Sequence, residues 1–177
     1  MFQKFDLLWA WFVRVATNWL PDAKCCLRLR GALYSLAMKK AGKNFQVASD
    51  VRFTHLRWLS VGDNVYIGPN SVLILADDVT IGNDVLIAHK VMITSRNHAY
   101  ENGKWNQGSR RAPVVVKDGA WIGANAAVLP GVTIGRGTVL AACSSAPKSL
   151  PDYAVCAGVP AEVKKRLELP KEEQERI

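Results

Sequence analysis

A chain of 177 residues, 49% of them apolar, has the size and composition of one globular domain. The formal net charge of +8 suits an anionic partner, but many Asp residues in the central region argue against nucleic acid, and we expect no nucleic-acid partner. No segment has the roughly 18–20 consecutive apolar residues that a membrane span requires.

Residues 1 to about 40 are predicted to form two helices, at about Phe2–Leu20 and Ala23–Lys40, broken at Leu20-Pro21-Asp22. The first is rich in Trp and Phe, and the second interleaves Leu and Ala with Lys and Arg. Such helices suit a membrane interface, where rings lie at headgroup depth and cations meet anionic lipid. They equally suit packing on the main domain or on a sister subunit. Propensity does not separate these roles, so peripheral contact with the inner membrane face stays open.

Residues 41–160 repeat an aliphatic residue followed by Gly or Ala, mostly at a spacing of six. Short-period repetition of this kind is typical of a β-solenoid. Each hexad forms a short strand whose aliphatic residue points inward, and the small residue occupies the corner. The repeat reads Val61-Gly62, Ile67-Gly68, Ile81-Gly82, Ile87-Ala88, Val116, Ile122-Gly123, Val128, Ile134-Gly135 and Leu140-Ala141.

The repeat is irregular in three places. Its phase slips by two residues between Phe53 and Val61, and again between Ile67 and Ile81. A longer break follows Ile93 and predicts an excursion loop over about residues 96–113. After the repeat, residues 161–169 read as a short helix within a C-terminal region 161–177 that ends in a charged tail.

Three stretches carry a resemblance to a known family: residues 85–98, which end in Asn97-His98, Trp121–Gly135 and Ala157–Ala161. Over about residues 41–168 the chain resembles the left-handed β-helix hexapeptide acyltransferases, within the maltose/galactoside and polysaccharide O-acetyltransferase branch. The resemblance implies an all-β solenoid, a left-handed parallel β-helix with N-terminal helices and a short C-terminal helix. It also implies acetyl-CoA as cosubstrate and a homotrimer. In this family the active site lies between prisms, with a His from one subunit and much of the CoA wall from its neighbour.

The excursion contains the candidate base. Acetyl transfer from a thioester to a hydroxyl requires a group that removes the hydroxyl proton, and a His with a pKa of about 6.5 suits that task. By resemblance, His98 occupies the position of the catalytic His. We expect His89, within an ordinary hexad, to be a surface or subunit-interface residue, and we assign no role to His55.

Candidate acceptor-binding residues lie in and before the excursion. The family orients its acceptor sugar with polar groups from the preceding coil, and Asn70 with Asp77 or Asp78 falls in the equivalent stretch. The spacing there differs by about two residues, so the choice between the two Asp residues stays open, as does a simple turn role. Tyr100 and Trp105 offer an aromatic platform for a sugar ring.

The resemblance places coenzyme A along the later coils. The residues that match the family's cofactor wall are Trp121, Gly123, Ala124, Ala142, Lys148 and Lys165. The sequence departs from the family's pattern for the adenosine end at Pro147, where the family usually has Thr, and at Glu162, where a basic residue is common. The four cysteines lack CxxC spacing, so we interpret them as reduced thiols of a cytoplasmic protein, and we expect no metal.

The leading hypothesis is an acyl-CoA-dependent O-acetyltransferase that acetylates a sugar hydroxyl, with His98 as general base. The basic, Trp-rich N-terminus favours a cell-surface polysaccharide or its lipid- or nucleotide-linked precursor. An N-acetyltransferase of a nucleotide-linked amino sugar and a non-catalytic structural prism are alternatives. A carbonic anhydrase on the same prism needs three imidazoles around zinc, and the spacing of His89 and His98 does not match that family.

Overall fold

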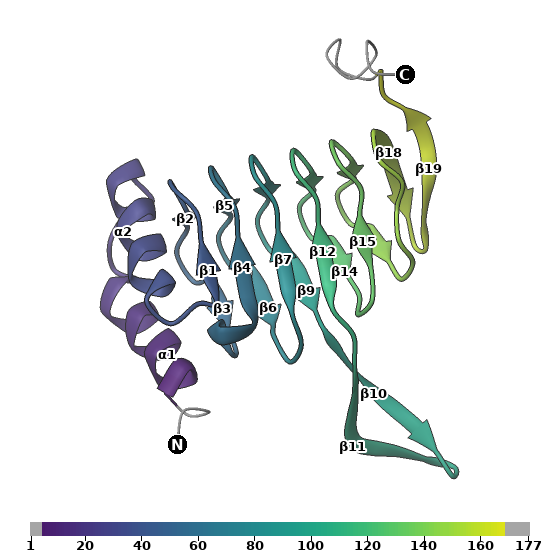
Figure 1. Cartoon of the computed structure of the whole chain (residues 1–177), viewed down its shortest axis with the longest axis horizontal. Coiled ribbons are helices and arrows are strands. Elements are labelled where there is room, and N and C mark those ends of the chain that lie inside the picture. Colours follow the sequence, from purple (N-terminus) through teal and green to yellow (C-terminus); the bar gives the residue numbers. More distant parts are fainter. Residues whose placement is uncertain (1–4, 169–177) are drawn as a thin grey trace.

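The structure, a computed structural model, describes residues 5–168, and the side chains of 106–109 are not described. Two helices, α1 (Phe5–Thr17) and α2 (Lys24–Ser35), precede a solenoid of short parallel strands (Figure 1). α1 ends at Thr17, before the predicted Leu20, and α2 is shorter than the predicted Ala23–Lys40; residues 2–4 of the first predicted helix lie outside the described residues. α2 ends early because the following residues already join the solenoid, where the Lys39 N–H donates to the carbonyl of Leu59 at 3.1 Å. No helix within residues 5–168 is long and apolar enough to cross a membrane.

The solenoid has three faces, each a sheet in which strands from successive coils pair. Sheet A contains β1 (Lys40–Ala41), β4 (Leu59–Val61), β7 (Val79–Ile81), β12 (Val114–Val116) and β15 (Thr133–Ile134). Sheet B contains β2 (Gln46–Val47), β5 (Tyr66–Ile67), β8 (Leu86–Ile87), β13 (Trp121–Ile122), β16 (Val139–Leu140), β18 (Ala154–Gly158) and β19 (Ala161–Arg166). Sheet C contains β3 (Arg52–Phe53), β6 (Val72–Ile74), β9 (Met92–Thr94), β14 (Ala127–Val128) and β17 (Ser145–Ala146).

The inward aliphatic residues of the repeat stack into continuous columns. In sheet B, Ile67 pairs with Ile87 and Ile87 with Ile122 across parallel strands, and all three side chains are 0% exposed. Their burial removes apolar surface from water and so stabilises the prism. The β-solenoid predicted from the six-residue spacing is therefore confirmed.

The turns between faces define two edges that matter for function. The B/C edge joins sheet B to sheet C at residues 48–51, 68–71, 88–91, 123–126 and 141–144. The C/A edge joins sheet C to sheet A at residues 54–58, 75–78, 95–113, 129–132 and 147–149. Because both flanking sheets pair in register, equivalent turns of successive coils lie above one another.

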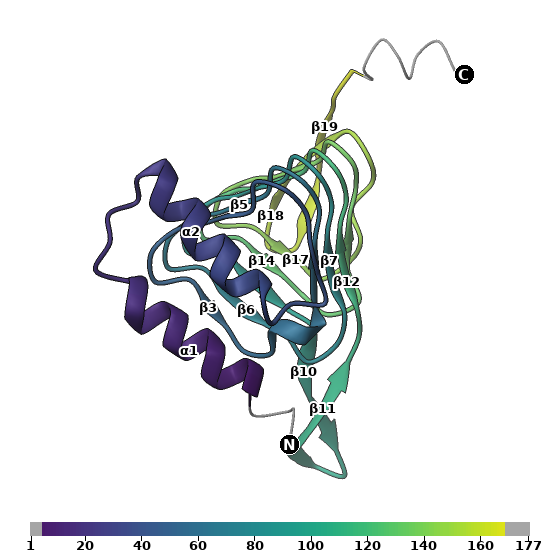
Figure 2. The ribbon, with the colours of Figure 1, turned by 60° about the vertical axis from the view of Figure 1, so that its left-hand side comes forward.

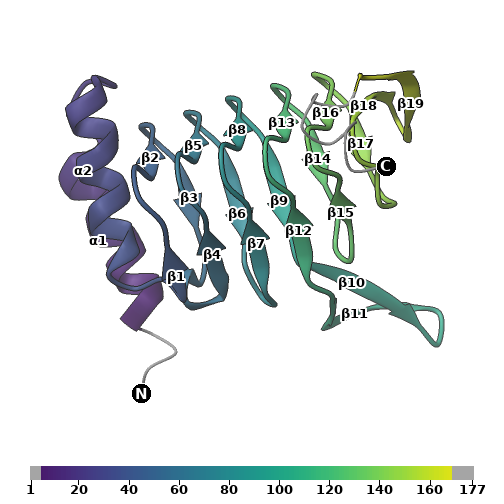
Figure 3. The ribbon, with the colours of Figure 1, turned by 45° about the horizontal axis from the view of Figure 1, so that its top comes forward.

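All three irregularities of the repeat lie on the C/A edge. The first slip forms the 3₁₀ turn η1 (Leu56–Trp58), and the second forms the turn at residues 75–78. The long break forms an antiparallel hairpin of β10 (Arg96–Glu101) and β11 (Lys104–Arg111), which projects from the prism (Figures 1 and 3). Regular hexads thus build the walls, and the inserted residues gather along one edge.

The two helices cap the first coil. Arg30 of α2 is 1% exposed; its guanidinium pairs with Asp22 at 2.7 Å and donates to the carbonyls of Thr17 and Leu20. Gly31 lets α2 approach closely, since a Cβ at this position would overlap the carbonyl of Phe45. These contacts cover the open end of the apolar column, as a terminal unit of a solenoid must.

The predicted C-terminal helix is wrong. Ala161–Arg166 instead form β19, which pairs antiparallel with β18 at the last coil. The exposed edge of β18 offers unpaired backbone groups, and pairing satisfies them. This tertiary demand outweighs the helical propensity of the Glu, Lys and Arg residues in the segment. Residue 169, the last of the predicted helix, lies outside the described residues.

Candidate functional site

The hairpin holds His98 on an exposed, irregular strand. His98 lies opposite Ser109, and the strand register shifts between His98 and Ala99. The His98 N–H donates to the Asn97 side-chain oxygen at 3.0 Å, while Ala99 is buried. The local bulge therefore presents the imidazole at the surface and directs the next side chain inward.

An aromatic pair lies further along the same hairpin. Tyr100 pairs across the strands with Trp105, and their ring centroids are 5.1 Å apart with a 60° interplanar angle. The side chains are 59% and 73% exposed. Tilted aromatic contacts of this kind stabilise each other, so the pair presents a preorganised apolar surface two residues beyond His98.

Asp77 and Asp78 lie on the same C/A edge, one coil before the hairpin. The Asp78 carboxylate pairs with the Lys39 ammonium at 2.8 Å, and the Asp78 N–H donates to the Asp77 carboxylate at 2.8 Å. Both side chains are half-buried. The two carboxylates therefore have different partners: the Lys39 ammonium neutralises Asp78, whereas the Asp77 carboxylate accepts a hydrogen bond from a backbone N–H.

Ser95 supports this corner, and the sequence reasoning missed it. Its side chain is 0% exposed, and its hydroxyl oxygen accepts from the N–H groups of Ala76 and Asp77, each at 2.9 Å. The hydroxyl also donates to the carbonyl of Asp77 at 3.1 Å. A serine immediately before the break in the repeat was the available signal, because a polar residue at a buried corner needs partners.

Asn70 does not join the hairpin within one chain. It lies on the B/C edge with a left-handed backbone (φ 61°), and its N–H donates to the carbonyl of Ser49 at 3.2 Å. Asn tolerates this conformation better than most residues. Sheet C separates Asn70 from the C/A edge that holds His98 and the two aspartates.

The candidate cofactor residues are spread over four places. Trp121, 51% exposed, points outward from β13 beside Leu86. The B/C edge carries Gly123, Ala124 and Ala142. Gly123 is buried, and a Cβ there would lie 2.5 Å from the backbone nitrogen of Ala142, so close stacking of the coils requires glycine.

The two candidate lysines lie apart from that edge. Lys148 is exposed on the C/A edge after β17. Lys165 is exposed on β19 and pairs with Val155, so it projects from a strand and not from the predicted helix. The structure thus brings together three of the six cofactor residues at one edge.

The remaining nucleophilic and metal-binding residues are dispersed. The four cysteines are free thiols, and burial raises the pKa of the Cys156 thiol, which lowers its reactivity. Within the described part of the chain, 5–168, no three His, Cys, Asp or Glu residues gather in a way that could hold a metal ion.

Comparison with known proteins gives two family matches within the solenoid. The family described as bacterial transferase hexapeptide (six repeats) matches residues 113–145. The family described as hexapeptide repeat of succinyl-transferase matches residues 59–95. The two segments flank the hairpin, so the matched coils are those that frame the candidate site.

Two curated relatives come from Escherichia coli (strain K12). One is named "Putative colanic acid biosynthesis acetyltransferase WcaF"; it is 33% identical over 153 residues, which cover 86% of this chain and 83% of the relative. The other, a galactoside O-acetyltransferase, is 32% identical over 135 residues, covering 76% of this chain and 66% of the relative. Both alignments extend beyond either family match alone.

A solved structure of galactoside acetyltransferase in complex with coenzyme A has a TM-score of 0.81 to this chain. It is 25% identical, and the alignment covers 94% of this chain and 82% of that one. The hexapeptide-repeat neighbours are left-handed β-helices, which supports the expected hand of the coil.

Proposed function

Because the chain belongs to the hexapeptide-repeat acetyltransferases, we propose that it transfers the acetyl group of acetyl-CoA to a hydroxyl group of a sugar. The observation that carries this proposal is the hairpin that interrupts the matched coils and exposes His98 beside an aromatic pair. The relatives named for colanic acid biosynthesis and for galactoside O-acetylation indicate the same reaction class. The acceptor is then a cell-surface polysaccharide or its lipid- or nucleotide-linked precursor.

His98 acts as the general base in this proposal. Its imidazole accepts the proton of the sugar hydroxyl while the hydroxyl oxygen attacks the thioester carbonyl. When the tetrahedral intermediate collapses, the C–S bond breaks and the protonated imidazole returns the proton to the departing thiolate. The products are an acetyl ester and free coenzyme A, and the histidine is regenerated. The exposed position of His98 on the hairpin gives it access to both substrates.

The acceptor binds along the C/A edge. Tyr100 and Trp105 supply the surface against which a sugar ring stacks. Asp77 is the better candidate for a hydrogen bond to the sugar, because the Lys39 ammonium already occupies the Asp78 carboxylate. Ser95 then acts as a positioning residue, since it holds the backbone of Asp77.

The cofactor binds along the B/C edge, beside Gly123, Ala124 and Ala142, with Trp121 on the adjoining face. Lys148 and Lys165 remain candidates for the phosphates at the adenosine end, although they lie elsewhere on the prism. One chain therefore carries the base and the cofactor wall on opposite edges of sheet C. A threefold assembly completes the site if the C/A edge of each chain faces the B/C edge of a neighbour. The same arrangement brings Asn70 towards the hairpin of a neighbouring chain. We therefore propose a homotrimer.

A cytoplasmic location accompanies this proposal. The free thiols include the exposed Cys25 and Cys143, and a reducing compartment keeps such thiols free.

The direct test is a screen of the purified protein with acetyl-CoA and a panel of neutral, amino and nucleotide-linked sugars, with free thiol detected. Reactions without an acceptor measure hydrolysis of the thioester alone. Nuclear magnetic resonance of the product then identifies an ester or an amide. Acceptor-dependent thiol release with an ester product is expected. An amide product would replace the proposal with N-acetylation, and thiol release that no sugar stimulates would refute acetyl transfer to sugars.

A further inference from the structure

Helix α1 exposes an apolar stripe that the prism does not cover. Its inner side packs on α2 and the first coil through Ala10 and Val13, which are at most 4% exposed. Six large apolar side chains on its outer sides and just beyond its end are between 51% and 78% exposed: Phe5, Leu8, Trp11, Phe12, Val15 and Trp19. A continuous stripe of this size marks an interaction surface, because isolated proteins seldom expose such patches.

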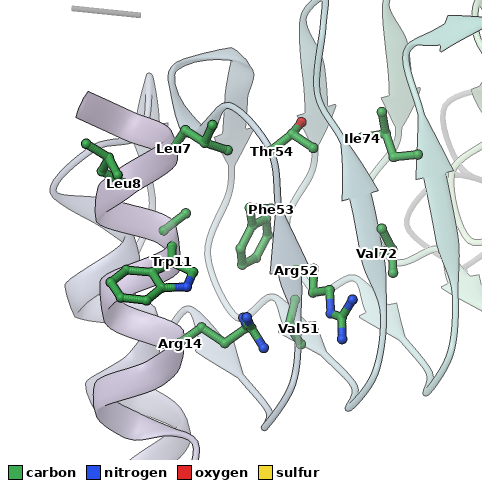
Figure 4. A pocket seen from close by; sticks show the side chains of 11 residues that line it. Leu7, Leu8, Trp11, Arg14, Val51, Arg52, Phe53, Thr54, Val72 and Ile74 are labelled. Carbon is green, nitrogen blue, oxygen red and sulfur yellow. The ribbon is translucent and has the colours of Figure 1, made fainter. Parts of the chain in front are cut away.

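A groove of about 690 Å³ lies between α1 and the outer face of sheet C (Figure 4). Leu7, Leu8 and Trp11 form the helix wall. The opposite wall is apolar as well, with Val72 and Ile74 from β6. The groove is thus continuous with the exposed stripe and has the apolar lining that a hydrocarbon chain requires.

Two guanidinium groups line the same groove. Arg14 comes from α1 and Arg52 from β3, and both lie towards the same end of the groove in Figure 4. Arg14 has one ion-pair partner, Asp50, at 3.6 Å, whereas Arg52 is exposed. An apolar channel with two cations at one end is complementary to an acyl chain that carries an anionic headgroup.

The charge of the N-terminal segment points the same way. Between residues 5 and 43 the acidic residues are Asp6 and Asp22. The Arg57 guanidinium neutralises Asp6, and Arg30 neutralises Asp22. The exposed basic residues of this region are Lys24, Arg28, Lys40 and Lys43, besides Lys39, which pairs with Asp78. A second copy that met this surface symmetrically would oppose cations with cations, whereas an anionic bilayer attracts them.

From the stripe, the groove and the charge, we propose that α1 and the groove beside it dock the protein on an anionic phospholipid bilayer. The rings of α1 lie in the headgroup region, as interfacial helices do, and the groove takes an acyl chain. The start of α1 and the hairpin extend to the same side of the prism in Figures 1 and 2. This step rests on the proposed function: a chain docked in this way presents its hairpin to a lipid-linked glycan.

Co-sedimentation of the full chain with vesicles tests the docking surface without any need for activity. The vesicles contain phosphatidylcholine alone or equal parts of phosphatidylcholine and phosphatidylglycerol. We expect the protein to pellet with the anionic vesicles, and less so at high salt. The double substitution Arg14→Gln and Arg52→Gln should weaken binding about 25-fold, since each cation near the surface contributes roughly fivefold.

A second variant carries Leu8→Glu and Phe12→Glu and should abolish pelleting. Control variants Val159→Glu and Lys164→Gln change exposed residues at the opposite end of the solenoid and should bind like the parent. Circular dichroism and light scattering establish folding and assembly. If the glutamate variant fails to fold, Trp19→Ala replaces it, because that ring is 78% exposed.

Failure of the parent chain to bind anionic vesicles would overturn the proposal. Equal binding by the parent and the folded stripe variants would overturn it too. If the parent does not bind vesicles and a stripe variant changes the mass of the assembly, the stripe is instead a contact between copies of the chain. Transfer to a soluble sugar is measured separately, so a failure of docking is distinguishable from a failure of the enzymatic proposal.

Discussion

Replacing Ser95 by alanine tests whether one hydroxyl group organises the corner next to the hairpin. In Ser95→Ala, the backbone N–H groups of Ala76 and Asp77 lose their acceptor. A buried donor left without a partner costs about 1–3 kcal/mol. Ala76 is buried, but Asp77 is half-buried and regains some hydration. The expected loss in the free energy of unfolding is therefore about 2–4 kcal/mol.

Ser71→Ala is the matched control. Ser71 is also 0% exposed, but its hydroxyl accepts from one N–H group, that of Val91 at 3.2 Å, so its loss should cost about 1–2 kcal/mol. Thermal unfolding at one fixed protein concentration measures both variants, and Ser95→Ala should melt about 5–15 °C below the parent. Ser95→Ala should also raise the KM for the acceptor sugar, because it releases Asp77. A Ser95→Ala melting temperature no lower than that of Ser71→Ala would refute this reasoning.

Three further predictions concern the cap, the last coil and the hairpin. Arg30→Met, which removes the guanidinium bound to Asp22 and two carbonyls at the helix ends, should lower the unfolding free energy by about 2–4 kcal/mol in urea denaturation. Burial alone would raise the pKa of Asp152, but a backbone N–H and the Lys117 ammonium lower it below its ordinary value. The stabilisation from Asp152 is therefore present above pH ~4 and lost as pH falls through the lowered pKa. In thermal unfolding at a series of pH values, Asp152→Asn should be less stable than the parent at pH 7 and as stable as the parent once the pH lies below the lowered pKa. An equal difference in stability at every pH would contradict this. Trp105→Ala should raise the KM for the acceptor about 5- to 100-fold, as loss of a stacking surface costs about 1–3 kcal/mol, and leave the KM for acetyl-CoA unchanged in steady-state kinetics.

The architecture of the repeat could be predicted because one rule recurs in every coil. An inward aliphatic residue every six positions leaves few alternatives to a solenoid, and Ile67, Ile87 and Ile122 stack as that spacing indicates. The excursion after Ile93 was predicted by the same rule, as its largest violation, but its folding into an antiparallel hairpin was not. What the spacing did not reveal is that both smaller slips lie on the same edge as the hairpin.

The wrong prediction for Ala161–Arg166 has a different origin. Local propensity favoured a helix, whereas the unpaired edge of β18 selected a strand. Similarly, the resemblance pointed to His98 and to Asp77 or Asp78 as site residues, but the supporting hydroxyl of Ser95 emerged from the geometry of the corner. The serine before the break was a signal, but its partners Ala76 and Asp77 lie one coil earlier, and coil stacking brings them to it.

The separation of the candidate base from the candidate cofactor residues could be seen only in the structure. Asn70 and Ala124 lie on the B/C edge, and His98 lies across sheet C on the other edge. One coil takes about 18–20 residues, as the pairs Tyr66–Leu86 and Trp121–Val139 show. Residues only one hexad apart in the sequence therefore lie on different edges of the prism. The proposed trimer follows from this separation, and light scattering of the purified protein measures it directly.

The most direct test of the central claim is the rate of acetyl transfer by His98→Ala, measured beside His89→Ala. Both side chains are exposed, and His89 lies in a regular turn of the B/C edge. With the best acceptor, His98→Ala should lower kcat by about 10²- to 10⁴-fold, the contribution typical of a general base, with the KM for acetyl-CoA unchanged. His89→Ala, on the edge proposed for the cofactor, should lower kcat far less than His98→Ala, because it removes no proton acceptor for the sugar hydroxyl. Parental kcat in His98→Ala would contradict the assignment of the base and, with it, the role proposed for the hairpin.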